Sequence, residues 1–123
     1  MDFIDNQPIY MQISDYFCEN ILTREWKENE KIPSVREIAV LVEVNPNTAI
    51  RAFNFLQDQG IIYNKRGIGY FVAEDGYIKA LEMRKNEFIH KDVPVFFKTM
   101  KLLGLKCSDM EQLYNSIEVS KSW

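Results

Sequence analysis

Apolar residues recur at intervals of three and four positions near the start of the chain. They are Ile9, Ile13, Tyr16, Phe17 and Ile21. Residues at these intervals share one face of an α-helix, so the pattern predicts an amphipathic helix over residues 9–22. Pro8 stands just before this segment, where a proline favours the start of a helix.

Two shorter helices are predicted next, separated by a turn of three residues. Ser34 and Glu37 have the S-x-x-E spacing of a capping box, in which both side chains accept hydrogen bonds from backbone N–H groups of the first turn. Asn45 and Pro46 are typical of the cap and the first position of a new helix, so the earlier helix has to end before them. Gly60 is suited to a left-handed cap at the end of the later helix.

After Gly60 the period of the apolar pattern falls from about four residues to two. Residues 61–63 and 69–72 are typical of strands, and the polar residues between them of a turn, so we expect a β-hairpin. Beyond the hairpin the pattern is helical again. A long helix is expected from Tyr77, kinked or broken at Pro94 and ended by Gly104, and Ser108 with Glu111 predicts a capping box for a short last helix.

This order of elements is that of a winged helix-turn-helix domain. We expect a mostly α protein with a small β-hairpin, with a DNA-binding domain over residues 1–75 and a two-helix C-terminal tail over residues 76–123. In that arrangement the third helix enters the major groove and the basic hairpin tip reaches the minor groove. The candidate DNA-binding residues are Ser34, Arg36, Asn45, Asn47, Thr48, Arg51, Lys65, Arg66 and Gly67. A purely structural interpretation stays open for several of them, as a helix cap, a solvated ion pair or an ordinary polar turn.

The charges are unevenly distributed, although the formal net charge is only −3. Residues 1–30 carry −5, residues 31–72 carry +2, and residues 73–123 are neutral. DNA binding depends on the charge of one face and not on the net charge of the whole chain. The small positive surplus of residues 31–72 lies in the predicted DNA-binding segment. Because the surplus is small, we expect few phosphate contacts per subunit and DNA binding that is sensitive to salt.

Several classes of protein are excluded by composition and spacing. The two cysteines, Cys18 and Cys107, have no CxxC spacing and are expected to be reduced core residues, and His90 has no cysteine or second histidine at metal-ligand spacing. We therefore expect no metal site, no cofactor and no enzyme. No apolar run approaches the roughly 18–20 residues of a membrane span. Residues 1–5 carry two acids and no base, so we expect no secretory signal, a cytoplasmic location and no membrane partner.

Ordered blocks of sequence resemble the GntR family of bacterial transcription regulators. They are P-I-Y at 8–10 with Q-I at 12–13, I-P-S-V-R-E-I-A at 32–39, V-N-P-N-T at 44–48, G-I-I at 60–62 and R-G-I-G-Y-F-V at 66–72. The resemblance implies a winged-helix domain that binds a two-fold operator in double-stranded DNA as a homodimer, usually as a repressor. Carried over by position, it includes Gly69 with the other DNA-binding candidates in the wing.

The chain departs from the family pattern at a few positions. Arg24 and Asn29 stand at usual glycine positions, and Trp26 stands at a usual leucine position. Asparagine tolerates the left-handed conformation, so its substitution for glycine is mild. Pro46 stands where some members carry a base-reading arginine, and we do not count it among the base-reading residues.

The short tail resembles that of the YtrA-like subfamily, in which it forms the dimer. About fifty residues follow the wing, too few for the effector-binding or aminotransferase-like domain of other members. Two helices with apolar stripes need a further surface to cover them. The candidate dimer-interface residues are Leu81, Phe88, Ile89, Phe96, Phe97, Met100, Leu103, Leu113 and Ile117. The alternative is that the stripe packs back on its own winged helix.

We therefore expect a homodimeric, sequence-specific regulator of transcription, most simply a repressor. The alternative is a winged helix used for protein–protein contact without sequence-specific DNA binding, which the small positive balance favours. A small-molecule effector of unknown identity is a further partner to consider; it would have to bind between the tail helices, where no polar cluster marks a site.

Overall fold

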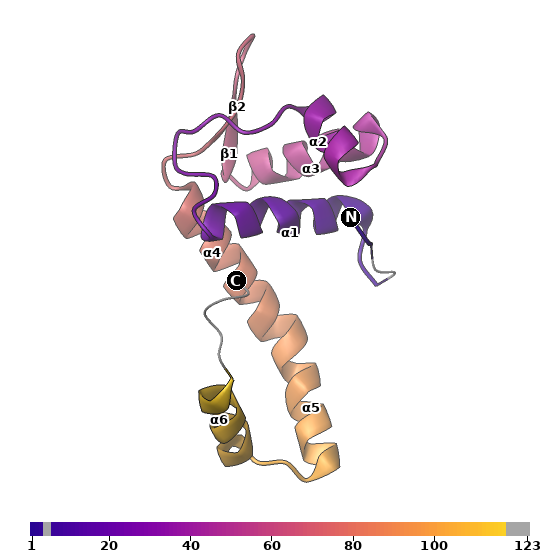
Figure 1. Ribbon diagram of the computed structural model, residues 1–123, viewed down its shortest axis with the longest axis vertical. Helices are drawn as coiled ribbons and strands as arrows, with labels where there is room; N and C mark the ends of the chain where they lie inside the picture. The colour runs from indigo at the N-terminus through magenta and orange to yellow at the C-terminus, as the bar shows by residue number, and fades with distance from the viewer. Residues whose placement is uncertain (4–5, 118–123) are drawn as a thin grey trace. The chain divides into compact units, whose positions relative to one another are not determined.

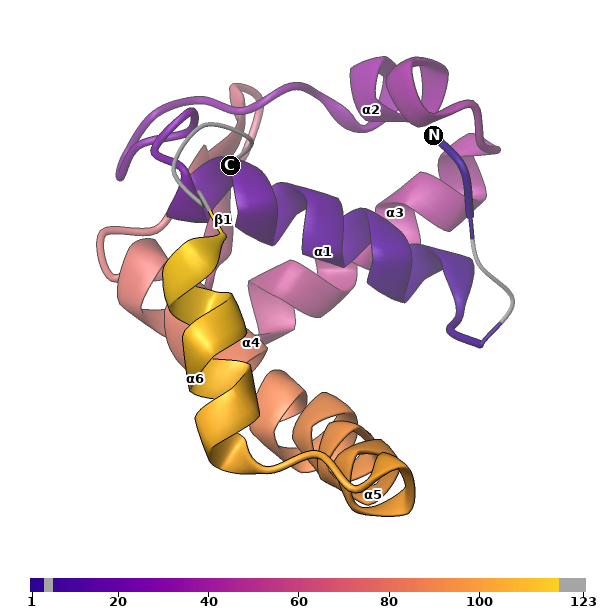
Figure 2. The same ribbon diagram turned by 60° about the horizontal axis from the view of Figure 1, so that its bottom comes forward.

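Three helices and a hairpin form the first part of the computed structural model, which describes residues 1–3 and 6–117. The elements are α1 (Ile9–Leu22), α2 (Val35–Val42), α3 (Pro46–Asp58), β1 (Ile62–Lys65) and β2 (Gly69–Val72). α1 and α2 both pack on α3, and the hairpin projects away from the helices (Figure 1). Figure 2 shows α1 crossing over α3. The mostly helical winged-helix fold expected from the sequence is confirmed.

Local hydrogen bonds place the helix ends where the sequence predicts them. Ser34 Oγ accepts a hydrogen bond from the Glu37 N–H at 3.1 Å, and Glu37 Oε1 accepts one from the Ser34 N–H at 3.0 Å. Asn45 Oδ1 accepts a hydrogen bond from the Asn47 N–H at 2.8 Å, and Pro46 is the first residue of α3. Gly60 follows α3 with a φ of 74°. These boundaries depend on neighbouring residues alone.

Aromatic side chains connect the helices to the hairpin in the core. The ring of Phe17 on α1 lies 5.0 Å from that of Phe53 on α3 and 5.1 Å from that of Trp26, and Phe53 lies 4.7 Å from Tyr70 on β2. Such tilted and edge-on ring pairs are favourable beyond the apolar area that they bury. The core therefore holds the hairpin at a set position relative to α3.

One residue of the expected apolar stripe of α1 is exposed, and so is an apolar residue of α2. Ile9, the first residue of α1, is 43% exposed, and Leu41 on α2 is 57% exposed. Both have the spacing of core residues, but Ile9 is the first residue of its helix, and Leu41 lies on a part of the α2 surface that the core does not cover. Position on a helical wheel predicts a shared face, and only the neighbouring elements decide how wide the covered face is.

The segment between α1 and α2 also supports the wing. β1 and β2 pair antiparallel, from Ile62 opposite Val72 to Lys65 opposite Gly69. On the other edge of β2, the Ile32 N–H donates to the Tyr70 carbonyl at 2.9 Å, and the Val72 N–H donates to the Glu30 carbonyl at 3.0 Å. The wing is therefore anchored on both sides of β2.

Three residues other than glycine lie in the left-handed region among those that the structure describes. They are Arg24, Asn29 and Glu43, with φ values of 67°, 64° and 58°. Arg24 and Asn29 are the positions where the family pattern has glycine, which explains that preference because glycine adopts positive φ without steric cost. Glu43 lies in the turn between α2 and α3.

A second compact unit begins at Arg84, after the first unit of residues 1–83. α4 (Gly76–Glu87) is followed by a π-helical turn, η1 (Phe88–Asp92), and by α5 (Val93–Leu103), which Gly104 ends with a φ of 71°. The helical segment does not stop at Pro94. Proline cannot donate the usual backbone bond, and the preceding residues widen into the π turn instead.

The last helix, α6 (Cys107–Ser116), does not begin with the expected capping box. Ser108 lies inside the helix, and Asp109 Oδ2 accepts a hydrogen bond from the Lys106 N–H at 2.9 Å. The acid three residues after Lys106 supplies this contact, so the pairing of Ser108 with Glu111 was wrong. Across residues 1–3 and 6–117, no helix has both the length and the apolar character needed to cross a membrane.

Candidate nucleic-acid interface

The first turn of α3 presents polar side chains on the side away from the core. Asn45, Asn47 and Arg51 are exposed and Thr48 is half-buried, whereas Ala49 on the opposite face is fully buried. Asn45 Oδ1 is used in the cap, which leaves its amide N–H groups for a ligand. The exposed amide and guanidinium groups on neighbouring turns of one helix can reach base edges in a major groove.

Arg51 is held by an aromatic residue of α1 that the sequence analysis did not count as functional. Its guanidinium carbon lies 4.6 Å from the centre of the Tyr10 ring, and that ring contacts Phe55 edge-on at 6.0 Å. A cation over an aromatic face is attracted by the ring quadrupole. Tyr10 therefore restricts where the Arg51 side chain lies. Tyr10 belongs to a quoted sequence block, but spacing alone could not pair it with Arg51.

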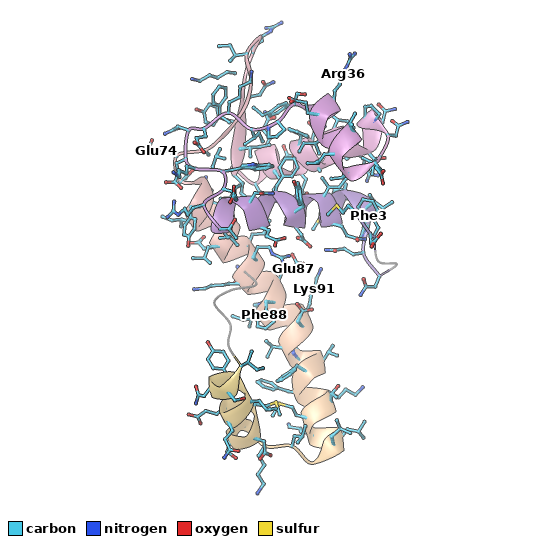
Figure 3. The ribbon with its side chains drawn as sticks, viewed as in Figure 1. Phe3, Arg36, Glu74, Glu87, Phe88 and Lys91 are labelled. Atoms are coloured by element: carbon cyan, nitrogen blue, oxygen red, sulfur yellow. The ribbon has the colours of Figure 1, made fainter. Side chains whose placement is uncertain are left out.

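The start of α2 contributes Ser34 and Arg36, both exposed. Arg36 points away from the helices, on the side to which the hairpin projects (Figure 3). Next to it, the backbone N–H and hydroxyl of Ser34 lower the pKa of Glu37 below its usual range, and the positive charge of Lys31 adds to the effect. Glu37 is thus a cap of α2, and Arg36 is left facing solvent, where it can contact a phosphate.

The wing presents Lys65, Arg66 and Gly67 to solvent. Gly67 has a φ of 80° at the tip of the hairpin, a conformation that glycine adopts without strain. The Lys65 ammonium lies 4.7 Å from the centre of the Phe71 ring. The wing therefore ends in two bases on a supported strand pair.

Gly69 and Lys31 meet at the base of the wing. Gly69 has a φ of 141°, and a β-carbon there would lie 2.9 Å from Lys31 Cε. Lys31 is exposed and pairs with Phe71 across a β-bridge. From the sequence Lys31 contributed only to the charge sum, because its contact with the wing is formed between residues about forty positions apart in the chain. Lys31 adds a cation between the wing and the start of α2.

The expected dimer-interface residues are mostly exposed. Leu81 in the first unit is half-buried, and Met100 in the second is buried. The exposed members are Phe88, Ile89, Phe96, Phe97, Leu103, Leu113 and Ile117. A groove between α5 and α6 is lined by apolar residues from both helices, with Glu111 as its one ionisable carboxylate.

The two cysteines differ in their surroundings. Cys18 is buried in the core, as expected, whereas Cys107 is exposed at the start of α6, so its expected core position is wrong. The Lys106–Asp109 bond starts the helix there, and the Cys107 side chain is left exposed. In the part of the chain that the structure describes, no group of three or more His, Cys, Asp or Glu side chains gathers as a metal site would require.

Comparison with known proteins gives consistent matches. Residues 9–72 match the profile of bacterial regulatory proteins of the gntR family. The chain is 36% identical over 108 residues to the HTH-type transcriptional regulator YhcF of Bacillus subtilis, covering 88% of each chain. It is 39% identical over 75 residues to the HTH-type transcriptional repressor YtrA of the same organism, covering 61% of this chain and 58% of YtrA. A solved GntR-family transcriptional regulator from Listeria monocytogenes is 34% identical, with a TM-score of 0.76 over 94% of this chain and all of that one.

Proposed function

Because this chain belongs to the gntR family of bacterial regulatory proteins, we propose that it represses transcription by binding a two-fold operator as a homodimer. Members of the family are transcriptional regulators with a helix-turn-helix DNA-binding domain, not enzymes, and they bind operator DNA. The name of its relative YtrA supports the repressor assignment. The proposal therefore concerns the operator, the oligomeric state and the direction of regulation.

The observation that carries the DNA-binding part is the exposed polar first turn of α3. In our proposal Asn47 and Arg51 read bases in the major groove, where amide and guanidinium groups form paired hydrogen bonds with base edges. Arg36 contacts the phosphate backbone, and Lys65 and Arg66 of the wing reach the minor groove. The protein–protein alternative is not favoured, because the family to which the chain belongs consists of DNA-binding regulators.

The exposed apolar face of the second unit supports the homodimer. Phe96 is 51% exposed and Leu103 is 65% exposed, although both are large and apolar. Exposed apolar side chains that gather on one face are typical of a protein interface. A second copy of the chain supplies the same apolar surface in a two-fold contact and also accounts for a two-fold operator.

The first test is a fluorescence-anisotropy titration with the DNA upstream of the protein's own gene. We expect tighter binding to this DNA than to a scrambled duplex at physiological salt, with two chains per duplex at saturation. Arg51→Ala should weaken operator binding by roughly 1–3 kcal/mol and relax the sequence preference. No binding to either duplex at low salt would favour the protein-interaction alternative, and equal binding to both would mean that the operator lies elsewhere or that an effector is required.

The dimer is tested by sedimentation of Phe96→Asp and Gln112→Asp. Both substitutions add one negative charge to an exposed position of the second unit, but Gln112 does not line the apolar groove. We expect Phe96→Asp to dissociate the dimer and weaken operator binding, and Gln112→Asp to leave both unchanged. An intact Phe96→Asp dimer would show that this face is not the interface.

A further inference from the structure

A shallow apolar groove lies between α2 and the start of α3. Its volume is about 400 Å³, and it is lined by Arg36, Ala39, Val40, Val44 and Pro46. Val40 is 79% exposed. This is far more exposure than an apolar side chain has when it serves the core, so the groove needs another explanation.

The groove offers almost no hydrogen-bond donors. The side chains of its lining residues other than Arg36 carry only carbon and hydrogen. Pro46 has no backbone N–H, and the N–H of Val44 is already bonded to the Ala39 carbonyl at 2.9 Å. Away from the Arg36 edge, the wall formed by Ala39, Val40, Val44 and Pro46 therefore offers a base edge apolar contact and no hydrogen-bond donor.

The groove is continuous with the proposed DNA-binding face. Arg36 lines one edge and points to the side to which the hairpin projects (Figure 3), and Pro46 directly precedes Asn47 in the first turn of α3. An exposed guanidinium at this edge attracts a phosphate group. A bound duplex would thus bring its major groove against Val40 and Pro46.

The 5-methyl group of thymine is the apolar group that base pairs present in the major groove. We propose that the groove formed by Val40, Val44 and Pro46 receives the 5-methyl group of one operator thymine in each half-site. Arg36 contacts a phosphate nearby. This inference rests on the proposed function and adds a specificity determinant to it, because a cytosine or a purine at that position would leave the groove unfilled.

The test compares thymine with deoxyuridine, which lacks only the 5-methyl group. Duplexes that bind the full chain are first enriched from a random-sequence pool, and each thymine of the strongest duplex is then replaced in turn. We expect one position in each half-site at which the replacement weakens binding about four-fold, the effect of losing one buried methyl group. Replacements elsewhere in the duplex serve as internal controls.

Protein variants show whether that methyl group lies in this groove. In Val40→Ser and Pro46→Ala the ratio between the thymine and deoxyuridine duplexes should fall toward one. Leu41→Ser is the matched control, because Leu41 is also exposed on α2 but does not line this groove, and it should keep the four-fold ratio. Because Val40 is highly exposed, we expect Val40→Ser to fold normally, so that misfolding does not account for a lower ratio. Thermal melts of both groove variants check that they are folded.

The outcomes separate this inference from the proposed function. A duplex in which every thymine can be replaced without loss would overturn the inference and leave operator binding standing. A four-fold ratio that persists in both groove variants would place the methyl contact elsewhere and would also overturn it. Failure to enrich any sequence from the pool would refute specific DNA binding and the inference together.

Discussion

Glu43 ends α2 in a left-handed conformation, with φ 58° and ψ 53°. A residue with a β-carbon pays roughly 1–2 kcal/mol in this conformation, because the β-carbon crowds the following carbonyl oxygen. Glycine avoids this cost but loses about 0.5–1 kcal/mol more conformational entropy on folding. We therefore expect Glu43→Gly to raise the free energy of unfolding by about 0.5–1 kcal/mol, or the melting temperature by about 2–8 °C.

Chemical denaturation of the full chain at one fixed concentration measures this effect, because dimerisation would make stability depend on concentration. Glu43→Ala is the matched control. It removes the same carboxylate but keeps a β-carbon in the left-handed conformation, so its stability should stay within about 0.5 kcal/mol of the parent protein. If the glycine variant were no more stable than the alanine variant, strain at this turn would not explain the difference.

The same pair of variants separates charge from conformation in DNA binding. Glu43 lies two residues before the cap of α3, and its negative charge opposes that of a phosphate backbone. Glu43→Gly and Glu43→Ala should therefore bind DNA more tightly than the parent by equal amounts, and the gain should shrink as salt rises. A gain confined to the glycine variant would instead connect DNA binding to the turn conformation.

Three further predictions concern packing, charge and pH. Gly76→Ala should destabilise the protein by about 1–3 kcal/mol in denaturant titrations, because a β-carbon would lie 2.6 Å from the Ile61 carbonyl oxygen; unchanged stability would contradict this close approach. Lys31→Ala should reduce the slope of log affinity against log salt by about 0.9 per subunit without changing the preference for operator, and Lys98→Ala in the second unit should leave the slope unchanged. The lowered pKa of Glu37 means that its carboxylate stabilises the fold above about pH 4.3, the ordinary value for glutamate, and that this contribution is lost as pH falls through the lowered pKa. The stability difference between the parent and Glu37→Gln should therefore vanish in acid, and a difference that persists at low pH would mean that the carboxylate is not the cause.

The helix ends near Ser34 and Asn45 and the left-handed conformation of Gly60 could be predicted because each depends on neighbouring residues. A cap needs a hydroxyl or amide and an N–H two or three residues away, so the sequence contains all that is needed. The exposed polar residues in the first turn of α3 could be predicted for the same reason, because they directly follow the Asn45 cap. The start of α6 is the exception, since Asp109 accepts a hydrogen bond from the Lys106 N–H and the helix begins before Ser108.

By itself the sequence determined the order of helices and strands, the face of α3 that carries Asn47 and Arg51, and the family. Only the tertiary structure placed Tyr10 under Arg51, Lys31 against Gly69 and Val40 beside Pro46. It also decided that Leu41 and Cys107 are exposed. Periodicity describes a single helix or strand, whereas each of these contacts joins residues of different elements. The distances between those residues are set by how the helices and the wing pack around Phe17 and Phe53.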